Sequence, residues 1–171
     1  MAKLDVLKWP DQGLRATATR VTEFDAQLHQ LVDDMFETMY DLCGVGLAGT
    51  QVGVLKQVIV VDCGQDERDP LVLINPEINR TEGEIIWPEG CLSIPGVRAD
   101  VTRYGTIEVV FSDQYGENRH LTATGLLAVC IQHEMDHLEG KMYFDHLGQF
   151  ERRAVLNAYR DYLESDEEAA P

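Results

Sequence analysis

Hydrophobic positions in residues 25–42 recur at the spacing of one helix face. Intervals of three and four residues between apolar side chains are typical of an amphipathic helix that packs on a core. The residues concerned are Leu28, Leu31, Val32, Met35, Phe36, Met39 and Tyr40. Thr22 and Asp25 resemble a capping box in which Asp replaces the usual Glu, so we expect the helix to begin there. We interpret this stripe of methionine and aromatic residues as core and not as a cofactor site.

Two continuous apolar runs follow and predict buried strands. They cover residues 57–62 and 71–75, and Pro76 is expected to end the second, because proline cannot donate to a strand ladder. Shorter strand-like segments follow at 84–87, 97–101, 106–111 and 119–122. The turn-forming residues 112–118 predict a hairpin between the last two segments.

Residues 125–131 are apolar on every side and lead directly into residues 132–137. A helix that is hydrophobic all round is normally buried. Thr124 is a suitable N-cap and Gly140 a suitable C-terminal stop. A last helix is expected from about 149 to 163. With short strands in the middle and helices towards the ends, the pattern predicts an α+β fold of mainly antiparallel sheets around a central helix.

The expected central helix carries the motif H-E-x-x-H at His133, Glu134 and His137. Residues four apart lie on one helix face, so both imidazoles can bind one metal ion. The glutamate between them can take a proton from a metal-bound water. A chance match or a solvated charged face is the simpler interpretation of such a short motif. The apolar lead-in argues against it, because buried ionisable groups are costly unless they are paired or bind a metal. The motif therefore indicates a metal-dependent hydrolase.

A third protein ligand is needed, because catalytic zinc-type sites usually have three. Tyr143 stands where one large class has a third histidine, and Cys130 is about two helical turns from the second histidine. Glu151 and Glu164 remain as alternatives, which would make the protein a metallopeptidase with a glutamate ligand. Cys91 is favoured over them, because its glycine-containing loop can present a thiolate that the ion would stabilise.

Composition and charge limit the remaining possibilities. The chain has 171 residues, with 30 acidic and 14 basic residues and a net charge of −16. We expect one catalytic domain over residues 1–164 and a disordered acidic tail over 165–171. The negative charge disfavours direct nucleic-acid binding. Because no apolar run suggests a membrane span or a signal peptide, we expect a cytoplasmic protein whose four cysteines are thiols or ligands.

Three segments together resemble the peptide deformylases. They are Gly44 to Gln51, Glu89 to Ser93, and Gln132 to His137, and they occur in that family's order and at spacings typical of its bacterial members. The similarity extends over about residues 6–147. The resemblance implies an α+β enzyme that removes the formyl group from the N-terminal formyl-methionine of newly made proteins and releases formate. Its expected partners are therefore formyl-methionyl nascent peptides, and we expect a monomer.

The resemblance also implies a role for each matched residue in the metal site. Cys91, His133 and His137 hold one divalent metal ion, for which Fe²⁺ is the expected species and Zn²⁺, Ni²⁺ or Co²⁺ are alternatives. Glu134 is the catalytic carboxylate. It receives the proton of the attacking water and passes it to the departing amine.

By the same resemblance, the Gln51 side-chain amide and the Leu92 backbone N–H donate to the formyl oxygen as negative charge develops there. The backbone around Val45 is expected to pair with the substrate like a strand, and an apolar pocket is expected to take the methionine side chain. The residues assigned to this substrate site are Gly44, Val45, Gly46, Leu126, Val129 and Cys130.

The chain departs from the family pattern at two places. Gly49 replaces the second alanine of the first motif, and we expect it to loosen the backbone that carries Gln51. Some relatives dock on the ribosome through a basic C-terminal helix, whereas here Arg152, Arg153 and Arg160 precede an acidic end. Ribosome association by that route is left undecided by the sequence.

Overall fold

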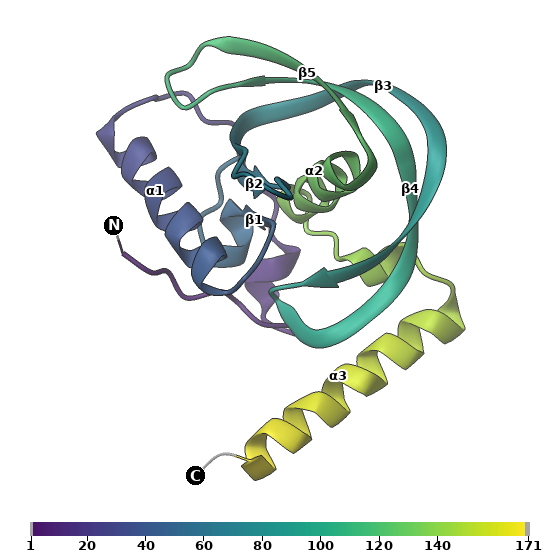
Figure 1. The fold of residues 1–171 in the computed structure, drawn as a ribbon. Helices are drawn as coiled ribbons and strands as arrows, with labels where there is room; N and C mark the ends of the chain where they lie inside the picture. Colours follow the sequence, from purple (N-terminus) through teal and green to yellow (C-terminus); the bar gives the residue numbers. More distant parts are fainter. Residues whose placement is uncertain (1, 170–171) are drawn as a thin grey trace.

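One five-stranded antiparallel sheet curves around a central helix in the computed structural model of the protein, which describes residues 2–169 (Figure 1). The strands lie in sequence order, each antiparallel to the next. They are β1 (Gly46–Ala48), β2 (Val58–Asp62), β3 (Pro70–Cys91), β4 (Ile94–Ser112) and β5 (Asn118–Thr124). The long ribbon of β3 and β4 passes around α2 (Gly125–Leu138), so the predicted α+β architecture is confirmed.

Helix α1 (Ala26–Asp41) lies where the apolar stripe predicts it. Its side chains Leu28, Val32, Met35 and Met39 are buried, which confirms their assignment to the core. The predicted capping box with Thr22 is wrong. Asp25 is itself the N-cap, and its carboxylate accepts the Leu28 N–H at 3.0 Å, so one short polar side chain satisfies an otherwise unpaired donor.

Strand β3 continues through Pro76, contrary to the prediction that this proline ends the strand. The β3–β4 register shifts between Ile74 and Glu77, and a bulge is one of the places where a strand tolerates proline. Asn75 has a left-handed backbone with φ 52°. Its side-chain amide binds the backbone of Val21 in both directions, at 2.8 and 2.9 Å. A contact with a segment 54 residues away therefore supports the bulge.

The remaining strand segments of the sequence prediction merge into β3, β4 and β5, and the hairpin between the last two is confirmed by the pairing of Ser112 with Asn118. Three short 3₁₀ helices complete the fold at Gln12–Arg15, Gly49–Val52 (η2) and Tyr143–His146. Within residues 2–169, no helix has the length and apolar character needed to cross a membrane.

Helix α3 (Gln149–Ala169) is longer than predicted. The acidic segment assigned to a disordered tail is helical as far as Ala169, so that prediction is wrong for residues 165–169, while 170–171 lie outside the described residues. Glutamate and alanine are good helix formers, and adding residues to an existing helix does not require a new nucleus. The side chains of residues 164–168 are exposed, as expected for a charged segment.

Strand β2 separates two parts of the core. Because side chains alternate along a strand, Val58 and Val60 pack towards α1, whereas Ile59 and Val61 pack towards α2. Helix α2 is thereby enclosed, and Ala128, Val129, Cys130 and Ile131 are all buried, as its uniformly apolar sequence predicts. The polar residues that follow on the same helix are carried into the interior of the protein.

Both ends of α2 are fixed by the backbone more than by side-chain caps. Thr124 is the N-cap residue, as predicted, but its side chain makes no capping hydrogen bond. Gly140 follows the helix with φ 74°, and a Cβ there would lie 2.5 Å from the Arg15 carbonyl oxygen. Only glycine fits both the left-handed conformation and this close approach. Gly140 is therefore required by packing against Arg15 as well as by the end of the helix.

Candidate metal centre and active site

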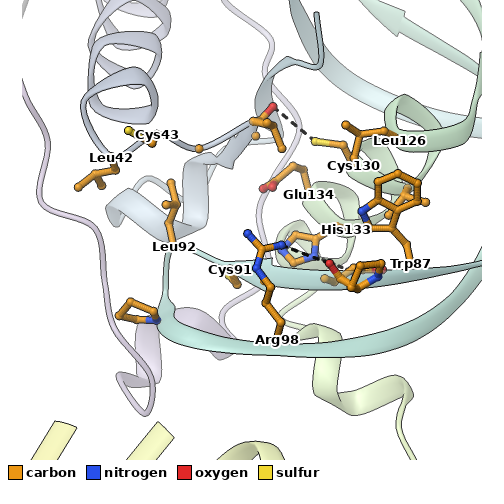
Figure 2. A pocket seen from close by; sticks show the side chains of 18 of the residues that line it. Leu42, Cys43, Trp87, Cys91, Leu92, Arg98, Leu126, Cys130, His133 and Glu134 are labelled. Atoms are coloured by element: carbon orange, nitrogen blue, oxygen red, sulfur yellow. Dashed lines mark hydrogen bonds and ion pairs between the residues drawn. The ribbon is translucent and has the colours of Figure 1, made fainter. Parts of the chain in front are cut away.

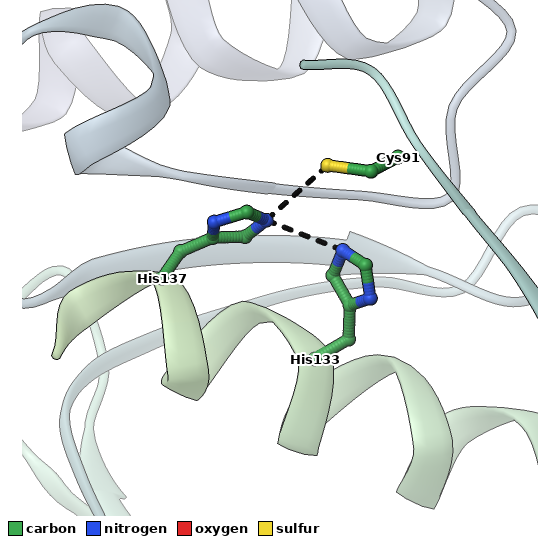
Figure 3. A group of neighbouring side chains, drawn as sticks. All are labelled: Cys91, His133 and His137. Carbon is green, nitrogen blue, oxygen red and sulfur yellow. Dashed lines mark hydrogen bonds between the residues drawn. The ribbon is translucent and has the colours of Figure 1, made fainter. Parts of the chain in front are cut away.

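Three potential metal ligands converge from two elements (Figure 3). His133 and His137 lie one turn apart on α2, and Cys91 ends β3. The His137 Nε2 atom is 3.2 Å from His133 Nε2 and 3.4 Å from Cys91 Sγ. One ligand atom from each of the three residues lies within 4.8 Å of the others. The geometry thus brings together the two histidines and the cysteine that the sequence favoured as a third ligand.

The other candidate ligands lie elsewhere. Glu151 and Glu164 are exposed on α3, and the convergent group contains neither of them. Cys130 is buried one turn before the histidines and is not part of the group either. A thiolate with two imidazoles suits divalent first-row metals such as iron and zinc, and three protein ligands leave a position open for a reactant. The donor set therefore fits a catalytic divalent ion.

A buried network orients His133. Its Nδ1 lies 2.8 Å from Glu89 Oε1, so an Nδ1–H donates to the carboxylate and Nε2 faces the other two ligands. Arg103 donates two hydrogen bonds of 2.8 Å to Glu89 and one of 2.6 Å to Asp136. Burial alone would raise the pKa of Glu89, but the hydrogen bonds from Arg103 and His133 outweigh it and lower that pKa. Glu89 is therefore a charged acceptor held in one place.

His137 is held in the form that a metal ligand requires. Burial, together with the nearby His133, holds the pKa of His137 well below its ordinary value. The imidazole is consequently neutral near pH 7, and a neutral imidazole nitrogen is the species that binds a metal. Thr50 donates its hydroxyl hydrogen to the His137 carbonyl at 2.9 Å, which ties α2 to η2.

Glu134 is buried beside the ligands without a paired cation. Its side chain points into the cavity (Figure 2), the residue is 4 % exposed, and its Oε2 has no hydrogen-bond partner within residues 2–169. The pKa of Glu134 is raised to about 7, mainly by burial. A positive charge on His133 opposes this rise, and the negative charge of Glu89 adds to it. A carboxylate with a pKa near neutrality can both accept and release a proton. This is the property required of a general base that later acts as an acid.

The side-chain amide of Gln51 is fixed next to the ligands. Its Oε1 accepts the Ala48 N–H at 2.9 Å, and its Nε2 donates to Ser93 Oγ at 3.1 Å. The same nitrogen lies 3.5 Å from Cys91 Sγ. The N–H side of the amide therefore faces the β3–β4 turn, where Leu92 directly follows Cys91.

Gly49 does not loosen the backbone that carries Gln51, contrary to the prediction from the sequence. A Cβ at this position would lie 2.9 Å from the carbonyl oxygens of both Lys56 and Val54. The backbone packs closely there, and the residue Gln51 is 1 % exposed. Tight packing and the amide hydrogen bonds fix Gln51 despite the glycine two residues earlier.

A cavity of about 820 Å³ opens in front of Glu134 and the ligands (Figure 2). All six residues assigned to substrate binding line it. They are Gly44, Val45, Gly46, Leu126, Val129 and Cys130. Leu92 lines it as well, together with Trp87 and Arg98, which sequence reasoning did not single out. The last two lie on the long β3–β4 ribbon, and their approach to the cavity depends on the curvature of that ribbon.

Comparison with known proteins identifies relatives over nearly the whole chain. The family model for polypeptide deformylase matches residues 3–153. A peptide deformylase of Xylella fastidiosa (strain M12) is 51% identical over 158 residues, which cover 91% of this chain and 93% of the relative.

Two solved structures have the same fold. A crystal structure of a peptide deformylase from Legionella pneumophila has a TM-score of 0.93 at 39% identity and covers 99% of this chain and 100% of its own. Another, from Synechococcus elongatus in complex with actinonin, has a TM-score of 0.87 at 45% identity, with coverages of 92% and 88%.

Proposed function

Because this chain belongs to the polypeptide deformylase family, we propose that it removes the formyl group from the N-terminal formyl-methionine of newly made proteins. It is an enzyme of that family, a metal-dependent hydrolase. The observation that carries the proposal is the buried Glu134 beside the convergent Cys91, His133 and His137, with Glu134, Cys91 and His133 lining the cavity.

We propose Fe²⁺ as the resident ion, with Zn²⁺, Ni²⁺ and Co²⁺ as ions that the same residues can hold. Cys91, His133 and His137 supply one sulfur and two nitrogen ligands, a set that suits all four metals. A bound divalent ion supplies Lewis-acid activation of water and of the formyl group. The chain's own residues account for the remaining chemistry.

Glu134 takes a proton from the attacking water and later gives it to the departing amine, so that formate and a free N-terminus result. A pKa of about 7 supports both transfers. The Gln51 amide and the Leu92 N–H donate to the formyl oxygen as it becomes negative, and loss of one such donor typically lowers the rate by about 10²–10³. Ser93 supports the first donor by accepting its other hydrogen bond.

The cavity lining supports a role in methionine recognition. Val45, Leu126, Val129 and Cys130 provide an apolar wall for an unbranched side chain. The backbone of Gly44 and its two following residues borders the same cavity, where a peptide can pair with it as an added strand. We propose that the protein is a monomer and acts in the cytoplasm on nascent peptides.

The decisive experiment measures formate release from formyl-Met-Ala-Ser by protein prepared anaerobically and loaded with metal. We expect release by the parent protein and its loss in Glu134→Ala, with acetyl-Met-Ala-Ser as the control substrate. No release by the metal-loaded parent, or undiminished release by the variant, contradicts the proposal. A metallopeptidase would instead cleave internal peptide bonds and keep its metal after Cys91→Ser, whereas we expect that variant to lose metal.

A further inference from the structure

A second cavity, of about 570 Å³, lies against another face of α2. Among residues 2–169, no residue lines both this cavity and the substrate cavity. Its lining includes Arg103 of β4, Asp136 of α2 and His146. The His146 Nε2 atom lies 2.7 Å from Asp136 Oδ2. His146 belongs neither to the convergent metal ligands nor to the lining of the substrate cavity, so any role in the active site must pass through Asp136.

The short contact between these two side chains is a hydrogen bond that His146 donates. Beside the Arg103 guanidinium the carboxyl group of Asp136 is ionised, and an ionised carboxylate only accepts hydrogen bonds. The Nε2 atom therefore carries the hydrogen. Arg103 Nη1 donates to the same Oδ2 atom at 2.6 Å and lies 3.3 Å from the imidazole nitrogen. One carboxylate oxygen thus accepts both N–H groups.

The backbone around His146 is fixed. This residue ends the 3₁₀ helix Tyr143–His146, whose first two residues are buried. The Asp145 carboxylate accepts the Met142 N–H at 2.9 Å and two hydrogen bonds from the Arg15 guanidinium. The His146 side chain is 37 % exposed, but the turn that carries it is anchored on both sides. Its hydrogen bond is therefore part of the folded structure.

The Arg103 guanidinium extends this contact to the metal ligands. Its Nε and Nη2 atoms donate to the two oxygens of Glu89 at 2.8 Å each. Because the guanidinium is planar, it holds the Asp136 and Glu89 carboxylates in one fixed arrangement. The Glu89 Oε1 atom also accepts the His133 Nδ1–H at 2.8 Å, so a tilt of the guanidinium moves the oxygen that orients this ligand. The resulting network, from the partly exposed end to the interior, consists of His146, Asp136, Arg103, Glu89 and His133.

We propose that His146 is a positioning residue, which through this network fixes the orientation of His133 as a metal ligand. The proposal rests on the metal site of the proposed function, but not on the identity of the reaction. The Arg103 and Glu89 side chains are only 4 % and 3 % exposed and are held on several sides. Loss of the His146 Nε2–H removes one of the two donors to Asp136 Oδ2 and leaves that end of the network free to shift.

Two amide variants test for the hydrogen bond itself. Glutamine places its amide nitrogen at about the distance of histidine Nε2 from the backbone, whereas asparagine is one methylene shorter. His146→Gln should bind Ni²⁺ as tightly as the parent protein, in competition with a chromogenic chelator. His146→Asn should bind Ni²⁺ about threefold to tenfold more weakly, as the loss of one hydrogen bond implies. The matched control is His120→Asn at an exposed histidine of β5, which should keep the parent affinity.

A double variant tests whether the effect passes through Glu89. Glu89→Gln replaces one acceptor oxygen by an NH₂ group, which interrupts the network before it reaches His133. In this background, His146→Asn should lower the Ni²⁺ affinity by less than about twofold further, because residues of one network are not additive. A local role of His146 would instead repeat the full threefold to tenfold loss there.

Parent-like Ni²⁺ affinity in His146→Asn overturns the proposal. So does an equal loss in both amide variants, or an undiminished loss in the Glu89→Gln background. Thermal unfolding of the metal-free proteins is measured alongside. If His146→Asn unfolds well below His146→Gln, the effect belongs to the stability of the turn, and the proposal is equally wrong.

Failure of this proposal and failure of the proposed function give different results. If the parent protein binds Ni²⁺ but releases no formate, the proposed function fails, while the affinities still test the network. If the parent releases formate but His146→Asn binds Ni²⁺ as tightly as the parent, only the positioning role of His146 fails.

Discussion

The substitution Gly46→Ala tests whether the carboxylate of Glu134 must occupy its observed position. Gly46 lies in β1 directly against α2, and an added Cβ would be 2.7 Å from Glu134 Oε1 and 3.0 Å from its Cγ. It would also be 2.7 Å from Cys130 Sγ. Ordinary van der Waals contact begins at 3.4 Å, so the new methyl group overlaps the carboxylate oxygen by about 0.7 Å. Since Gly46 has no left-handed backbone angle, alanine is compatible with the strand itself.

The expected effect follows from the displacement of the catalytic group. A shift of about 1 Å at a catalytic centre lowers the rate by about 10²-fold, equivalent to ~2.7 kcal/mol of transition-state stabilisation. The loss should appear in kcat, because the group that moves acts in proton transfer. Metal content should stay at the parent level, because Glu134 is not one of the convergent ligands. Overpacking costs about 1–3 kcal/mol of stability, and the reduced entropy of the unfolded chain offsets about 0.4–1 kcal/mol of this.

The assay combines steady-state formate release, metal analysis and thermal unfolding. Gly105→Ala is the matched control, because a Cβ at that strand position would meet its nearest neighbours at 3.8 Å, which is ordinary contact. We expect this control to keep its parent kcat. A Gly46→Ala protein whose kcat stays within about threefold of the parent refutes the positional argument. A variant that loses its metal refutes the assignment of the effect to Glu134.

Three further predictions follow from the same geometry. Glu89→Gln removes the charged acceptor of the His133 Nδ1–H, so metal affinity should fall by about 10–100-fold in competition with a chelator; unchanged affinity contradicts the orienting role. Ser93→Ala removes the acceptor of the Gln51 amide and should lower kcat by about fivefold at unchanged metal content, as one hydrogen bond of ~1 kcal/mol implies; an unchanged kcat contradicts it. Burial tends to raise the pKa of Asp62, but its hydrogen bonds lower it below the ordinary 3.8. Its stabilisation is thus complete above pH 3.8 and lost as the pH falls through the folded-state pKa. In urea unfolding, the stability difference between parent and Asp62→Asn should therefore shrink on acidification, and a constant difference would count against it.

Local sequence predicts best those features that depend on a single helix or strand. The helical spacing of His133 and His137 directs both imidazoles to one side of α2 whatever surrounds the helix. The apolar residues before them predict burial for the same reason. Both expectations agree with the structure, where the two Nε2 atoms are 3.2 Å apart and both histidines are buried.

Features that depend on distant segments were not predicted. Local rules predict that Pro76 ends a strand. In the structure β3 continues through it, because a bulge is supported by the contact between Asn75 and Val21. The pair of Glu89 and Arg103 was missed because it joins two long strands whose register the sequence does not reveal. The helical form of residues 165–169 was missed because composition indicates solvation, while the preceding turns of α3 allow the helix to propagate.

The charges around α2 show why one of its carboxylates stays unpaired. Asp136 accepts one hydrogen bond from Arg103, and Glu89 accepts two from the same guanidinium, so both are stabilised as anions. Glu134 lies close to them, but its Oε2 has no hydrogen-bond partner in the described part of the chain. A buried polar atom without such a partner lowers the stability of the fold by about 1–3 kcal/mol. Burial and the charge of Glu89 raise the pKa of Glu134 to about 7, whereas a divalent ion held by the adjacent Cys91, His133 and His137 would lower it. The same anion thus orients His133 and keeps Glu134 able to exchange a proton, which couples the geometry of the metal ligands to the chemistry of the base.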